Sequence, residues 1–255
     1  MQVFQTSNVV KFESAKISLP GHRQENQDSV EILADRDAAL IIVVDGMGGH
    51  AEGAKASQIT VATLQQCFAD ESHPVFDPQG FLTAALAAAH DRVVALGEHI
   101  ALEHRPRATC AICLIQDANA YSAHVGDSRI YQIRAARVLD RSRDHSHVEL
   151  LLREGLIQEH EIRSHPMRNF VECCLGGDRP IPDMSVAARR RLQSGDVVLV
   201  CTDGLWSGLA EADFAELGTG TDSLEHDLLS LGEAAVARNA PYSDNTSAAA
   251  LRWLG

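Results

Sequence analysis

The sequence predicts an α+β fold built in layers, because its expected strands occur in blocks and its expected helices in pairs. Short polar breaks separate the strand-like segments within a block, which is typical of antiparallel neighbours. Strands and helices do not alternate regularly, so a parallel sheet of βαβ units is not expected. The 255 residues are 45% hydrophobic and contain no linker-like stretch, and we interpret residues 1–255 as a single domain.

The order of the elements follows from the runs of apolar residues. Segments rich in β-branched side chains, such as residues 38–45, predict buried strands. The Ala- and Leu-rich residues 79–104 predict a long helix. The full expected order is strands at 12–19, 28–33 and 38–45, helices at 51–70 and 79–104, strands at 108–115, 120–125, 129–134 and 137–140, short helices at 145–157 and 158–164, a strand at 195–204, helices at 211–217 and 223–238, and a strand at 245–253.

The composition argues against several classes of function. A formal charge of −13, from 35 acidic and 22 basic residues, disfavours a nucleic-acid partner, which would need a basic surface. No apolar run approaches the roughly 20 residues of a membrane span. Residues 1–10 lack the basic start and apolar stretch of a signal peptide. We therefore expect a cytoplasmic protein that does not bind membranes.

The six cysteines lie within apolar segments, as expected for reduced thiols inside a cell. Cys110 and Cys113 form a C-x-x-C, but they belong to an expected strand, in which positions i and i+3 point to opposite faces. No second pair stands at zinc-finger spacing. We predict buried structural thiols.

Five aspartates stand at the edges of expected strands: Asp28, Asp45, Asp127, Asp203 and Asp244. A single aspartate there is often only a turn former or a helix cap. Five of them predict carboxylates that converge at one edge of the sheets. Carboxylates gathered in one place raise one another's pKa unless cations neutralise them. Mg²⁺ and Mn²⁺ are the hard cations that suit oxygen ligands, so the sequence predicts a divalent-metal site.

The glycine-rich stretch after Asp45 allows a second interpretation. Gly46, Gly48 and Ala51 match the G-x-G-x-x-G/A spacing of dinucleotide-binding loops. That fingerprint requires a βαβ unit, whereas here a polar loop with two prolines and another helix follow. Asp45 would also repel a pyrophosphate. We therefore expect the glycines to form a tight turn that lets a backbone carbonyl approach a metal ion.

Six motifs occur in one order between about Gly21 and Trp253, namely RQENQD, DGMGGHAEGAKAS, GDSRIY, RDHSHVELLLREGLI, CTDGLW and SDNTS. Together they resemble the metal-dependent protein phosphatases of the PPM family, also called type 2C serine/threonine phosphatases. DGMGGH is similar to the bacterial branch. The resemblance implies a four-layer αββα sandwich, in which two antiparallel β-sheets are flanked by helix pairs.

The resemblance also implies two tightly bound metal ions, Mn²⁺ or Mg²⁺. Asp45 resembles the carboxylate that bridges the two ions, and the backbone carbonyl of Gly46 would bind the second ion. Asp203 and Asp244 would complete the first site. Hydroxide held between the metals would attack the phosphorus of phosphoserine or phosphothreonine directly, without a covalent enzyme intermediate.

Four further features take their expected roles from the resemblance. Asp28 would lie in the outer shell and hold metal-bound water. Asp127, together with Asp203, resembles the pair that binds a weaker third metal ion. Arg23 resembles the arginine that grips the substrate phosphate with two parallel donors. Residues 145–174 resemble the mobile flap beside the active site.

The chain departs from the family pattern at two positions. Gln27 stands where some relatives carry a glutamate. Met47 occupies the place of a histidine that is proposed as general acid in the animal enzymes, and His50 need not replace it. No general acid is therefore assigned.

Several other residues have ordinary interpretations. His145 and His147 are expected on the flap surface, because magnesium-type sites prefer oxygen ligands. Trp206 is expected in the core. Arg189, Arg190 and Arg191 are expected along a solvated strand edge, where contact with an acidic partner is the less favoured alternative.

The expected partner is a phosphorylated protein, phosphorylated by an opposing serine/threonine kinase, and we expect a monomer. Two alternatives stay open: a catalytically inactive scaffold of the same fold that only binds phosphoproteins, and a phosphatase for small phosphoesters. The first would be expected to lack metal ligands, and none of the expected aspartates is missing.

Overall fold

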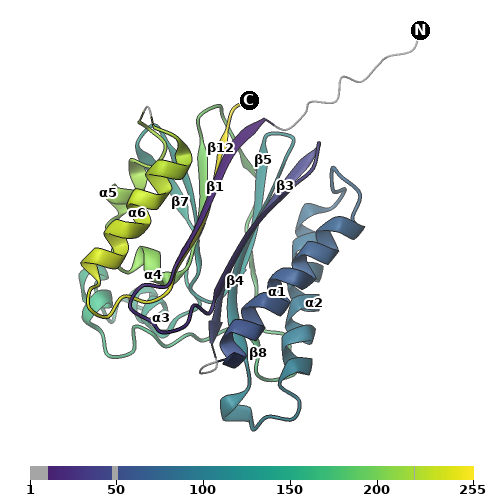
Figure 1. The fold of residues 1–255 in the computed structure, drawn as a ribbon, viewed down its shortest axis with the longest axis vertical. Helices are drawn as coiled ribbons and strands as arrows, with labels where there is room; N and C mark the ends of the chain where they lie inside the picture. Colours follow the sequence, from purple (N-terminus) through teal and green to yellow (C-terminus); the bar gives the residue numbers. More distant parts are fainter. Residues whose placement is uncertain (1–10, 48–50, 221) are drawn as a thin grey trace.

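The computed structural model describes residues 11–47, 51–220 and 222–255, which form two antiparallel β-sheets packed face to face with helices on both outer sides (Figure 1). The predicted α+β class and its four layers are confirmed. Gly48 and His50, which the sequence singled out, lie outside the described residues.

The two sheets divide the strands between them. The first sheet has the order β1–β12–β11–β6–β7 and the second has the order β10–β5–β4–β3–β2, with β8 paired to β4 and β9 paired to β5. The first sheet contains β1 (Phe12–Leu19), β6 (Arg129–Arg134), β7 (Arg137–Arg141), β11 (Val197–Cys201) and β12 (Thr246–Trp253). The second contains β2 (Asp28–Ala34), β3 (Ala38–Met47), β4 (Arg107–Gln116), β5 (Asn119–Val125), β8 (Leu175–Gly176), β9 (Ser185–Val186) and β10 (Arg190–Arg191).

Helices cover the outer face of each sheet (Figure 1). α1 (Ala51–Asp70) and α2 (Pro78–Leu96) pack on the second sheet, and α4 (Asp203–Trp206), α5 (Glu211–Ala215) and α6 (Leu224–Arg238) pack on the first. α3 (His147–Arg153) and the 3₁₀ turns η1 (Leu102–His104) and η2 (Glu159–Ser164) lie in connecting segments. Among the described helices, none is long and apolar enough to cross a bilayer.

One helix boundary differs clearly from the prediction. The helix expected at 79–104 ends at Leu96, because Gly97 caps it with its N–H directed to the carbonyl oxygens of Val94 and Ala95. The Ala- and Leu-rich composition predicted the helix but did not locate this end.

Strand β3 shows how alternation builds the layers. Leu40, Ile42 and Val44 pack against the helices, whereas Ile41 and Val43 pack against the other sheet, and all five are fully buried. In β4, Cys110 faces the helices and Cys113 faces the other sheet, as predicted. Alternation also places Asp45 on the face that looks toward the other sheet.

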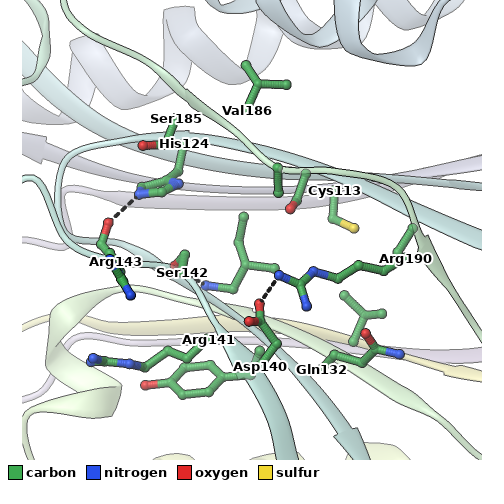
Figure 2. Close-up of a pocket in the computed structure, with 16 residues that line it drawn as sticks. Cys113, His124, Gln132, Asp140, Arg141, Ser142, Arg143, Ser185, Val186 and Arg190 are labelled. Atoms are coloured by element: carbon green, nitrogen blue, oxygen red, sulfur yellow. Dashed lines mark hydrogen bonds and ion pairs between the residues drawn. The ribbon is translucent and has the colours of Figure 1, made fainter.

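The edges formed by β7 and β10 are joined by an ion pair, in which Arg190 Nη2 donates to Asp140 Oδ2 at 2.6 Å. Figure 2 shows this pair beside a cavity of about 280 Å³ between the sheets. Elsewhere in the lining of this cavity, His124 Nε2 donates to the carbonyl oxygen of Arg143 at 2.7 Å. None of the predicted site residues lines this cavity.

The predicted position of residues 189–191 along a strand edge agrees with β10, which is the last strand of its sheet.

Candidate active site

A pocket of about 610 Å³ lies at the end of the gap between the two sheets. Asp28 is not among its lining residues, but six of the seven predicted site residues are. Its lining comprises His22, Arg23, Gln24, Glu25, Gln27, Asp45, Gly46, Met47, Asp127, Asn169, Val171, Asp203, Asp244 and Asn245. Side chains separated by more than 200 residues in the sequence therefore meet at one place.

Asp28 and Asp45 are direct cross-strand partners in the β2–β3 ladder, so their side chains share one face of the sheet. Burial raises the pKa of Asp45 well above its usual range, and the charge of Asp28 raises it further. Burial likewise raises the pKa of Asp28 to about 7, although hydrogen bonds from Ser247 and Thr202 oppose this change. Two like charges directly opposite each other are unfavourable without a cation between or beside them.

Asp203 and Asp127 add two more carboxylates to the pocket. Asp203 was predicted at the end of a strand, but β11 ends at Cys201 and Asp203 begins the short helix α4. Burial, together with the charge of Asp244, raises the pKa of Asp203 to about 6. Asp127 is only 5% exposed, and burial followed by the charge of Asp203 raises its pKa well above the usual value.

Two glycines let backbone segments approach closely around these carboxylates. A Cβ atom on Gly46 would lie 2.0 Å from the carbonyl oxygen of Gly53 in α1. A Cβ atom on Gly204 would lie 2.0 Å from the carbonyl oxygen of Asn245. Any larger residue would push α1 away from β3, or α4 away from the loop before β12. The Asp-Gly pairs therefore combine a carboxylate with a close backbone contact.

Arg23 lies beside the carboxylates, and its Nη2 donates to Asp244 Oδ2 at 2.6 Å. Asn245 fixes the loop that carries Arg23. Its Oδ1 accepts from the Gln27 N–H at 2.9 Å, and its Nδ2 donates to the carbonyl oxygens of Pro20 and Glu25, each at 3.0 Å. Sequence reasoning missed Asn245, although it lies in the SDNTS motif, because its partners are more than 200 residues away.

The donor set fits a hard divalent cation. It consists of oxygen atoms, its carboxylates raise one another's pKa, and Oδ1 of Asp28 is buried without a hydrogen-bond partner among the described residues. Within the described part of the chain, no three Asp, Glu, His or Cys side chains are already arranged to hold one ion. The Asp244 carboxylate is bonded instead to Arg23 and to the Asn245 N–H, so binding a metal would require it to reorient.

A buried ion pair is connected to Asp127 through the side chain of Trp206. Arg129 donates to both carboxylate oxygens of Asp144, at 2.8 and 2.7 Å, and these two residues are 9% and 8% exposed. The Arg129 guanidinium carbon lies 3.5 Å from the centre of the Trp206 ring. Trp206 Nε1 donates to the carbonyl oxygen of Asp127 at 2.9 Å. Trp206 packs partly buried against the core of the first sheet, as expected.

The predicted flap, residues 145–174, contains α3 and η2 and contributes Asn169 and Val171 to the pocket. His145 was expected on its surface, and this is wrong. The His145 ring is half-buried, stacks on His124 with ring centres 4.7 Å apart, and its Nε2 lies 2.7 Å from Ser185 Oγ. Burial and then the neighbouring His124 lower the His145 pKa to about 4. His147 is half-buried and lies 3.0 Å from Glu172 Oε1.

The positions that depart from the family pattern also lie at the pocket. Met47 lines it, and so does Gln27, whose Oε1 would be 2.6 Å from a Cβ atom on Gly53. Gln27 thus packs against the start of α1.

One cysteine has an arginine six residues later, Cys173 followed by Arg179, which is the spacing of cysteine-dependent phosphatases. Burial raises the pKa of Cys173, whereas a nucleophilic thiol needs a lowered one. The Arg179 side chain is 80% exposed and lies 3.6 Å from Glu98. The structure therefore does not support cysteine chemistry at this position.

A two-sheet sandwich that brings carboxylates and Arg23 together in one pocket is compatible with a metal-dependent phosphohydrolase. The family described as Protein phosphatase 2C matches residues 21–228. The chain belongs to this family of metal-dependent serine/threonine protein phosphatases.

Several curated relatives carry matching names. A putative protein phosphatase 2C-type protein of Streptococcus pyogenes is 31% identical over 75% of this chain and 78% of that protein. The protein phosphatase PhpP of Streptococcus pneumoniae is 31% identical over 77% of this chain and 80% of that protein. The serine/threonine protein phosphatase PstP of Mycobacterium tuberculosis is 31% identical over 76% of this chain, but the match covers only 36% of PstP.

Solved structures agree with the fold. The serine/threonine phosphatase of S. agalactiae superposes with a TM-score of 0.85 at 28% identity, and the match covers 96% of this chain and 100% of that one. The catalytic domain of PstP in complex with two manganese ions superposes with a TM-score of 0.81 at 27% identity, covering 97% and 100%.

Proposed function

We propose that this chain hydrolyses phosphoserine and phosphothreonine in proteins at the carboxylate pocket, with Mn²⁺ or Mg²⁺ as cofactor. The observation that carries the proposal is the meeting of four mutually repelling carboxylates with Arg23 in one pocket. Two ions would be held tightly, and a third more weakly. When bound, the metals supply a water whose pKa is low enough for it to act as the nucleophile near neutral pH.

Each residue of the pocket has a proposed role. Asp45 would bridge the two tight ions, with Asp203 and Asp244 on the first and the Gly46 carbonyl on the second. Asp28 would accept a hydrogen bond from metal-bound water through its unpartnered Oδ1. Asp127 would hold the third ion together with Asp203.

Arg23 would bind the substrate phosphate, and its present partner suggests how. Its guanidinium has five donors, and among the described residues Asp244 is its one side-chain acceptor. If Asp244 turns toward a metal ion, two parallel donors become available for phosphate oxygens. Arg23 would then orient the phosphorus and offset charge on the phosphate oxygens.

The wider setting is also proposed. The substrate would be a phosphorylated protein made by a serine/threonine kinase, and the enzyme would act as a cytoplasmic monomer without a nucleic-acid partner. The net charge of −13 is consistent with the last point.

The test is Asp45→Asn, which keeps the size of the side chain but removes the charge and replaces one ligand oxygen with an amide NH₂. With saturating Mn²⁺, the variant should fold and lose activity on phosphopeptides and on para-nitrophenyl phosphate. Asp91→Asn, on an exposed position of α2 outside the pocket, is the matched control and should keep full activity. Melting curves and calorimetric Mn²⁺ titration accompany the assays.

The outcomes separate the candidates. Near wild-type activity of Asp45→Asn would show that the aspartate only shapes the turn. A wild-type chain that binds phosphopeptides without hydrolysing any substrate would be the inactive scaffold. Hydrolysis of para-nitrophenyl phosphate but of no phosphopeptide would indicate a phosphatase for small phosphoesters.

A further inference from the structure

A second pocket, also of about 610 Å³, adjoins the carboxylate pocket and shares Asn169, Asp203 and Asp244 with it. The flap segment contributes Ile162 and Arg168 to one wall. The other wall comes from the end of α4 and the loop after it, the end of α6 and the loop before β12, and comprises Trp206, Ser207, Gly208, Ala210, Arg238, Asn239 and Tyr242. We call this second pocket the side groove. A chain bound through its phosphate in the first pocket would have to continue from it, and the side groove offers one such path.

The side groove contains two arginines, of which one forms an ion pair and the other forms none with the described residues. Arg238 donates to both carboxylate oxygens of Asp213, at 2.6 and 3.0 Å, so its charge is already compensated. The Arg168 side chain is exposed, and no ion-pair or hydrogen-bond partner for it occurs among the described residues. In a protein with a net charge of −13, an uncompensated cation beside the reaction pocket favours an acidic group on the bound molecule.

Tyr242 supplies an aromatic surface in the same groove. The residue is 89% exposed, although it stands two positions before Asp244 and its backbone N–H donates to the carbonyl oxygen of Asn239 at 2.9 Å. Exposed tyrosines are typical of binding surfaces, because a tyrosine side chain has few rotatable bonds and provides contact area at low conformational cost.

We propose that the side groove binds the residues next to the phosphorylated one and selects phosphopeptides that carry an acidic residue close to it, through Arg168, with Tyr242 packing on the peptide chain. This inference rests on the proposed phosphatase function. It assigns a substrate class that the carboxylate pocket alone does not specify, because the phosphate is the same in every substrate.

The experiment compares matched phosphothreonine peptides that carry glutamate, glutamine or lysine at each of the three positions before and after the phosphothreonine. The ratio of kcat/KM between the glutamate and lysine peptides is measured with saturating Mn²⁺. An exposed ion pair corresponds to about a two- to five-fold effect at the preferred position. The ratio should fall toward one as the salt concentration rises. Para-nitrophenyl phosphate, which has no neighbouring residues, reports the phosphatase reaction separately.

Charge reversal sharpens the test. Arg168→Glu should invert the preference, so that the lysine peptide becomes the better substrate. Arg137→Glu reverses another exposed arginine that lines neither pocket, and it should leave the ratio unchanged. Tyr242→Ser should raise KM for all peptides by about two- to ten-fold without changing the glutamate-to-lysine ratio.

A ratio near one at all six positions in the wild-type protein, with para-nitrophenyl phosphate still hydrolysed, would overturn the inference and leave the proposed function standing. A clear ratio that Arg168→Glu does not change would also overturn it, because the selection would then lie elsewhere. Failure to hydrolyse any substrate would refute the proposed function, and the inference with it.

Discussion

The buried pair of Arg129 and Asp144 gives the most quantitative prediction. In Arg129→Met, the stem of the side chain is retained but Asp144, only 8% exposed, loses both of its charged hydrogen bonds. Removing one partner of a buried ion pair costs about 3–5 kcal/mol, because the remaining charge stays desolvated. At about 2–4 °C per kcal/mol for a chain of this size, the melting temperature should fall by about 6–20 °C.

Arg190→Met is the matched control. Arg190 and Asp140 also form an ion pair, at 2.6 Å, but their side chains are 38% and 35% exposed. Exposed pairs contribute about 0–1 kcal/mol, so this variant should lose less than about 4 °C. Melting is followed by circular dichroism for both variants, and urea unfolding provides the free energies.

Arg129→Lys separates charge from geometry, because lysine keeps the charge but cannot donate in parallel to both oxygens of Asp144. The melting temperature of Arg129→Lys should lie between those of the wild type and Arg129→Met. The double variant of Arg129→Met and Asp144→Asn should lose less unfolding free energy than the two single variants together, by about 0.5–3 kcal/mol. Equal melting temperatures for Arg129→Met and Arg190→Met would refute the reasoning, since burial would then make no difference to the pair.

Three further predictions concern the pocket and the start of the flap. Gly46→Ala should lower the free energy of unfolding by at least about 1–3 kcal/mol in urea, because its Cβ atom would lie 2.0 Å from the Gly53 carbonyl oxygen, whereas Gly220→Ala, with its nearest atom at 3.9 Å, should be nearly neutral. Asp127→Ala should retain two Mn²⁺ ions in calorimetry and lose most of its turnover; loss of the two tight ions would place this residue at the inner site instead. The folded pKa of His145, about 4, lies below the unfolded value of about 6.5, so the unfolded state binds the extra proton and stability is lost as the pH falls through this window. The raised pKa values of Asp28 and Asp203 act in the opposite direction in the same window. The test is therefore the difference between two slopes: as the pH falls between those values, the unfolding free energy of His145→Gln should decrease less, or increase more, than that of the wild type, and an unchanged slope would contradict the assignment.

Much of the fold and of the carboxylate pocket could be predicted, because the relevant signals are local. The alternation in β3 determines which face each side chain occupies, and an aspartate one step beyond the apolar run must share the face of Ile41 and Val43. Asp28 on β2 then lies opposite Asp45, because β2 and β3 pair in antiparallel orientation. The role of each carboxylate stays a prediction.

What the sequence did not predict depends on partners far away in the chain. Nothing near Asn245 indicates that its amide holds a loop more than 200 residues earlier. His145 lies in a polar stretch that suggests a surface, yet tertiary packing stacks it on His124. The early end of α2 was missed because helix propensity in the following residues outweighed the signal of Gly97.

The carboxylates of the pocket come from both halves of the chain. A cut in the loop at residues 71–77, between α1 and α2, would leave Arg23, Asp28 and Asp45 on one fragment and Asp127, Asp203 and Asp244 on the other. On the proposed roles, neither fragment would contain the full set of metal ligands. Reassociation through the β1–β12 and β3–β4 ladders would restore the set. Phosphatase activity would then report that two tethered proteins have come together, so the division of the site between the two halves of the chain makes it suitable as a two-fragment proximity sensor.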